Sequence, residues 1–149
     1  MKTSIACLAL ALVVTLAPAA TAAPQAEGTN AKASLYAQVL DTGNRGIQVL
    51  RQSCTHPADQ HGCHPIRLHL RHAITRAVDR PILWVGERRR HAGVFWVLGP
   101  VRFGDGRASI RSAWREPGTM GGSGSNLDRF RWTNDVWNHT GGSGSAGCP

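Results

Sequence analysis

The sequence predicts a small single α+β domain in which an amphipathic helix packs on an antiparallel β-meander. Three observations predict this class. Apolar residues recur at helical spacing after Pro65, and four later segments are rich in β-branched and aromatic residues. Between two of these segments lies Asp105-Gly106, a dipeptide that favours a tight type I′ hairpin turn.

Residues 1–22 have the three parts of a secretory signal peptide. Lys2 is followed by an apolar run over residues 5–16, and Ala20-Thr21-Ala22 fits a cleavage site. The run is too short for a spanning helix, which needs about 20 apolar residues. We therefore expect a secreted or periplasmic protein without a transmembrane anchor, and the Ala-rich signal and Arg-heavy composition are typical of bacteria.

Removal of the signal peptide takes away Lys2 and lowers the formal net charge from +8 to +7. Residues 23–33 are small and polar and predict a flexible leader, so the domain is expected over residues 34–149. Two apolar stretches flank the turn-like residues 41–45. They favour a helix followed by a strand, although two strands of a hairpin would also fit.

The helix predicted after Pro65 carries its apolar residues on one stripe. The stripe consists of Ile66, Leu70, Ala73, Ile74 and Ala77. Proline suits the first helical position, and Asp79-Arg80-Pro81 suits the end.

Strands are predicted over residues 82–88, 94–103, 107–114 and 127–132. The Asp105-Gly106 turn would place Phe103 opposite Ala108, Val101 opposite Ile110 and Val97 opposite Trp114 on the core side. Pro100 cannot donate to a strand ladder, so it predicts an edge or a bulge there.

The same register places cationic side chains on the other side of the sheet. We expect this face to bind anions, because a guanidinium group bonds carboxylate or phosphate through two parallel hydrogen bonds. Trp96 is expected opposite Arg115, where it could stack with a ligand. The predicted binding residues are Trp96, Arg102, Arg111, Arg115, Arg129 and Arg131, joined by Arg88, Arg89 and Arg90 of a predicted turn.

Two identical GGSGS stretches occur at residues 121–125 and 141–145. Gly-Ser runs are typical of flexible connectors. Neither belongs to a phosphate-binding Walker motif.

The segment from Cys54 to Pro65 contains two cysteines and three histidines. Export favours oxidised cysteines, and a Cys54–Cys63 disulfide would close a short loop of turn-forming residues. Pairing of Cys63 with Cys148 is the alternative. His56, His61 and His64 are the candidate metal ligands, but their spacing matches no standard zinc framework, so we expect no metal and no cofactor.

The sequence contains none of the motifs G-x-S-x-G, H-E-x-x-H and C-x-x-C. We therefore expect a noncatalytic binding module rather than an enzyme, with an anionic polymer or an acidic protein as partner. A cell-envelope hydrolase with a pocket between helix and sheet is the first alternative. A histidine-rich zinc- or copper-binding protein is the second, and the oligomeric state stays open.

Overall fold

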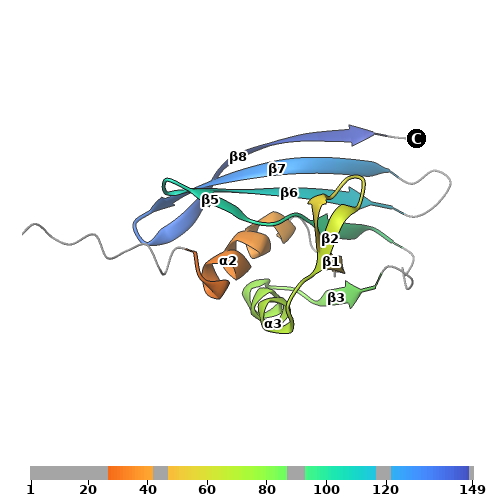
Figure 1. Cartoon of the computed structure of the whole chain (residues 1–149), viewed down its shortest axis with the longest axis horizontal. Coiled ribbons are helices and arrows are strands. Elements are labelled where there is room, and N and C mark those ends of the chain that lie inside the picture. The colour runs from red at the N-terminus through yellow and green to blue at the C-terminus, as the bar shows by residue number, and fades with distance from the viewer. Residues whose placement is uncertain (1–26, 42–46, 87–92, 117–121, 148–149) are drawn as a thin grey trace, which may run out of the picture.

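The computed structural model describes residues 27–41, 47–86, 93–116 and 122–147. These residues form two helices and one mixed eight-stranded sheet (Figure 1). The helices are α2 (Thr29–Leu40) and α3 (Leu68–Ala77). The strands are β1 (Ile47–His56), β2 (His61–Pro65), β3 (Ile82–Val85), β4 (Phe95–Leu98), β5 (Arg102–Gly104), β6 (Arg107–Arg115), β7 (Ser123–Thr133) and β8 (Val136–Gly147).

The sheet has the order β2-β1-β4-β6-β7-β8, with β3 beside β1 and β5 beside β6. The predicted α+β class is confirmed, but the purely antiparallel meander is wrong. Strand β1 runs parallel to both β3 and β4, whereas the other pairs are antiparallel. The chain reaches β3 through α3, and such a crossover brings a later strand back parallel to an earlier one.

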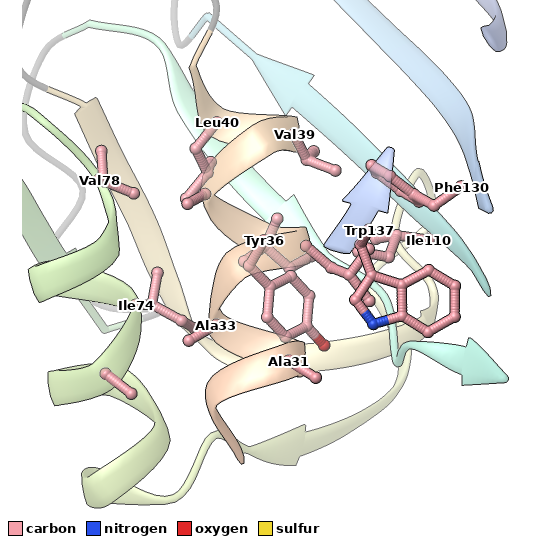
Figure 2. Packing of buried hydrophobic residues seen from close by; sticks show 14 of the residues in the cluster. Ala31, Ala33, Tyr36, Val39, Leu40, Ile74, Val78, Ile110, Phe130 and Trp137 are labelled. Atoms are coloured by element: carbon pink, nitrogen blue, oxygen red, sulfur yellow. The ribbon is translucent and has the colours of Figure 1, made fainter. Parts of the chain in front are cut away.

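Helix α2 is the central helix of the core. It lies between α3 and the strands that carry Ile110 and Phe130 (Figure 2). Leu35 and Leu40 are fully buried, as expected for a helix that is covered on most sides. The helix begins at Thr29, earlier than the predicted domain boundary at residue 34, because Ala31 and Ala33 are already part of the core.

Helix α3 corresponds to the amphipathic helix predicted after Pro65. It packs mainly against α2, through Ala73 and Ile74. It begins at Leu68, because Pro65 still belongs to β2 and pairs with Gln52 of β1. The predicted helix therefore begins too early, although Ile66 is buried as expected, and Ala77 at the end of the predicted stripe is exposed.

The predicted hairpin is present between β5 and β6. Phe103 lies opposite Ala108, and Asp105 and Gly106 have φ angles of 49° and 67°, as a type I′ turn requires. Beyond this hairpin the predicted register is wrong, because Val97 pairs with Ala113 instead of Trp114. The chain inserts an extra residue at Pro100-Val101, between the bond from Gly99 N to Arg111 O (2.6 Å) and the start of β5. This bulge, which Pro100 indicated, turns every β4 side chain to the opposite face.

The GGSGS stretches do not act as connectors where the structure describes them. Residues 123–125 belong to β7, and residues 141–145 belong to β8. The two stretches lie on paired strands and meet at one position, where Ser125 lies opposite Ser145 with 3.1 Å between the hydroxyl oxygens. The indole of Trp114 lies against Gly124, where an added Cβ would come within 2.5 Å of its Nε1 atom.

Candidate functional site

Side chains alternate strictly between two faces over the first half of β6. Ala108 and Ile110 are buried in the core beneath the helices, whereas Arg107 and Arg111 are exposed on the outer face. Strand β7 follows the same rule, since Phe130 is buried between the exposed Arg129 and Arg131. Over β6 and β7 the sheet therefore separates the core from a cationic outer face, whereas at β1 and β4 the face opposite the helices carries a second buried cluster that includes Leu50, Phe95 and Val97.

Four arginines surround one open cavity of about 540 Å³ on this outer face. We call it the arginine pocket, and its arginines are Arg102, Arg107, Arg129 and Arg131. Strand pairing fixes their positions, because Arg102 and Arg129 both pair with Ser109, while Arg107 pairs directly with Arg131. Within the described parts of the chain, none of the four forms a salt bridge.

The Arg107–Arg131 pair places two like charges opposite each other. Such cross-strand pairs lower stability by a few tenths of a kcal/mol to about 1 kcal/mol. An anion between the two guanidinium groups would remove this cost. The sequence prediction missed Arg107, although the predicted hairpin register already placed it on the same face as Arg111.

Hydroxyl groups complete the lining of the arginine pocket. Strand β8 contains a bulge opposite Arg129, where Thr140 is the extra residue. Its hydroxyl donates to the Arg129 carbonyl at 3.1 Å, and its side chain lines the pocket together with Ser109. A bulge of this kind re-aims a side chain that would otherwise follow the strand alternation.

A second cavity of about 440 Å³ adjoins the arginine pocket, with Leu127 lining both. It lies between the β1–β2 turn and strands β6 to β8, and it contains Arg111, Ser125 and Ser143. Arg115 has a different role, because it is half-buried and donates to the carbonyl of Ala58 in that turn. The structure thus separates Arg111 and Arg115 from the four arginines of the pocket.

The predicted position of Trp96 is wrong. It lies opposite Trp114 rather than Arg115, and only 8% of its surface is exposed. The bulge at Pro100 explains the error, because the shift of one residue turns Trp96 into the core. Its ring therefore does not reach a ligand on the outer face. Arg88, Arg89 and Arg90 lie outside the described residues.

The predicted Cys54–Cys63 disulfide is confirmed. The two residues face each other across β1 and β2, with their Cα atoms 3.9 Å apart. His56 and His61 also face each other, with ring centroids 6.0 Å apart, whereas His64 pairs with Ser53 and points to the other face. Among the described residues, no group of three or more potential metal ligands comes together.

Searches of family models, curated proteins and solved structures found no match to this chain. Neither α2 nor α3, the helices within the described ranges, is long and apolar enough to span a membrane.

Proposed function

We propose that the protein is an exported, noncatalytic binding module whose arginine pocket holds the acidic groups of an anionic polymer. One observation carries this proposal: four guanidinium groups line one open pocket, and none has a carboxylate partner in the described part of the chain. The disulfide and the predicted signal peptide support export, because disulfides persist in oxidising compartments.

The surface around the arginine pocket favours a polymer over an acidic protein. The centre of a protein interface is usually apolar and rich in aromatic residues. The exposed large hydrophobic side chains of the described residues include no aromatic residue, and the neighbouring cavity is lined by serines. A polymer recognised through its charges would lie across the arginine pocket and continue past Arg111. An acidic protein remains the alternative partner.

Heparin chromatography of the mature protein tests the proposal. Arg107→Ala with Arg131→Ala removes the facing pair of the pocket. Arg51→Ala with Arg76→Ala removes the same charge from exposed positions elsewhere, on β1 and α3. We expect the pocket variant to elute at clearly lower salt than the control variant. Each arginine contact that is lost reduces the number of counterions that the polymer releases on binding.

Equal elution of the two double variants would show that net charge alone causes retention, and it would overturn the proposal. A further comparison uses Arg111→Ala and Arg115→Ala. We expect Arg111→Ala to reduce retention more, because Arg115 is occupied by the Ala58 carbonyl.

The two alternative functions gain less support. A metal-binding role would rest on His56 and His61, because the disulfide removes both thiolates as ligands. A hydrolase needs a concave pocket with converging polar groups. Such a pocket is present between helix and sheet, but no carboxylate lines it. Its cationic and hydroxyl-bearing lining favours ligand binding.

A further inference from the structure

A third cavity lies on the helix side of the sheet and has a volume of about 520 Å³. We call it the helix-side pocket. It is bordered by α2, the start of α3, the β1–β2 hairpin and the Pro100-Val101 bulge. Its size is within the range of small-molecule sites, which usually measure about 300–1,000 Å³.

The polar lining of the helix-side pocket is cationic and hydroxylic. It includes Lys32, Tyr36, Ser53, Thr55, His64 and Arg67, and no aspartate or glutamate. The Lys32 ammonium lies 6.0 Å from the centre of the Phe103 ring and forms no salt bridge within the described residues. An anionic ligand group would therefore meet a charge that no side chain of the described protein neutralises.

Ser53 adds a hydroxyl group to the wall of the pocket. Its oxygen atom is shielded from solvent and lies close enough to the Tyr36 hydroxyl to lower the pKa of that phenol. A serine hydroxyl can also donate a hydrogen bond to a ligand oxygen that enters the pocket. Ser53 lies directly opposite His64 on the paired strands, so both side chains point to the same side.

Tyr36 fixes the inner end of the pocket. Its hydroxyl donates to the carbonyl of Gly99 at 2.9 Å. Burial raises the pKa of Tyr36, and the nearby Ser53 hydroxyl and Val101 backbone offset only part of this effect. The phenol therefore stays neutral at physiological pH and does not repel an anion.

The remaining wall of the pocket is apolar. Ile66 is buried, and Leu70 and Val101 are half-buried on the edge of the core. A ligand that uses the whole cavity needs an apolar body in addition to its acidic head. Inorganic phosphate or sulfate would leave this part of the lining without a partner.

We propose that the helix-side pocket binds a small organic acid, with its carboxylate near Lys32 and Ser53 and its apolar body against Ile66, Leu70 and Val101. This site is separate from the arginine pocket, and its ligand is a small molecule rather than a polymer.

Binding of benzoate to the mature protein, followed by ¹H–¹⁵N NMR titration, tests this proposal. Benzyl alcohol and benzylamine serve as neutral and cationic probes of similar shape. We expect saturable shifts at Tyr36, Ser53 and Val101 with benzoate, and weaker binding by about tenfold for the other two probes, because they lack the charge-assisted contact.

Two variants locate the carboxylate. Lys32→Met removes the ammonium group and keeps an unbranched apolar side chain, so it should weaken benzoate binding while leaving benzyl alcohol binding unchanged. Ser53→Ala should weaken benzoate binding by several-fold. The Arg107→Ala, Arg131→Ala variant is the control and should bind benzoate normally, so that failure here is distinct from failure of polymer binding.

Three outcomes would overturn the proposal. One is equal affinity for benzoate and benzyl alcohol, and another is a benzoate response that is lost in the Arg107→Ala, Arg131→Ala control. The third is the absence of saturation at millimolar benzoate in a protein whose spectrum shows a folded chain.

Discussion

The two faces of the sheet carry basic pockets of different kinds. The arginine pocket is open, and its long side chains extend into solvent, where salt screens charges within about 10 Å at 0.1 M. The helix-side pocket combines one lysine with a buried phenol, a shielded hydroxyl and an apolar wall. Positive charge alone therefore does not define a ligand. Four exposed arginines favour a polymer with many weak contacts, whereas a mixed lining of basic, hydroxyl and apolar side chains favours one small molecule.

The largest expected effect is a difference in stability between variants of two neighbouring β7 residues, which point to opposite faces of the sheet. Phe130 is 1% exposed, and Phe130→Ala should lower the free energy of unfolding by about 3–5 kcal/mol. Arg131→Ala should change it by less than about 0.5 kcal/mol, because the side chain is exposed. Urea unfolding measures both values. Similar losses for the two variants would contradict the assignment of the faces.

The next effect concerns the β1–β2 hairpin, which borders both the helix-side pocket and the cavity around Arg111. Replacing Cys54 and Cys63 together by serine should lower the free energy of unfolding by about 2–3 kcal/mol, because the unfolded chain loses a cross-link. Reduced wild-type protein should show a loss of the same sign. If the variant is as stable as the oxidised protein, the bond contributes nothing to stability.

The raised pKa of Tyr36, on the helix side of the sheet, predicts that the stability of the fold depends on pH. Its pKa in the folded state is raised above the ordinary 10.0. Its contribution to the free energy of unfolding is therefore complete below pH 10 and is lost as the pH rises. Above pH 10 the unfolded chain binds fewer protons, and stability should fall by up to about 1.4 kcal/mol per pH unit. Urea titrations between pH 9 and 11 should show that the free energy of unfolding falls less steeply with pH in Tyr36→Phe than in the wild type. Equal slopes would show that Tyr36 does not cause the pH dependence.

The smallest effect tests the facing arginines. Arg107→Gln removes the like-charge repulsion with Arg131 and should raise the free energy of unfolding by about 0.2–1 kcal/mol at low salt. The gain should shrink in 0.5 M NaCl, because salt screens exposed charges. Thermal unfolding at both salt concentrations measures it. Destabilisation at low salt would mean that Arg107 supports the fold instead of a ligand.

The sequence was informative where the determinants are local. Asp105-Gly106 determined the hairpin register and so placed Arg102 on the outer face, and the alternation with Phe130 and Trp132 placed Arg129 and Arg131 on the same face. The bulge at Pro100 was indicated, but the residue that it inserts was not counted, and this misplaced Trp96. The central position of α2 depends on burial from several sides, which a short apolar run does not reveal.

Strand β8 was missed for a related reason. Glycine and serine have low strand propensity, so residues 141–145 are typical of a linker. Their strand conformation comes from the partner β7, through pairs such as Ser125 with Ser145. The parallel pairing of β1 likewise depends on residues distant in the sequence, which local patterns do not specify.

The matched glycine-serine stretches have a practical consequence for anyone who edits this gene. A stretch that resembles a dispensable spacer forms half of a strand pair, and the Trp114 indole lies against Gly124 without room for a methyl group. Inserting a tag after Gly141, or ending the protein there, would remove the second half of β8 and leave the backbone of residues 123–128 open to neighbouring molecules. Tags are better placed ahead of Thr29, where α2 begins.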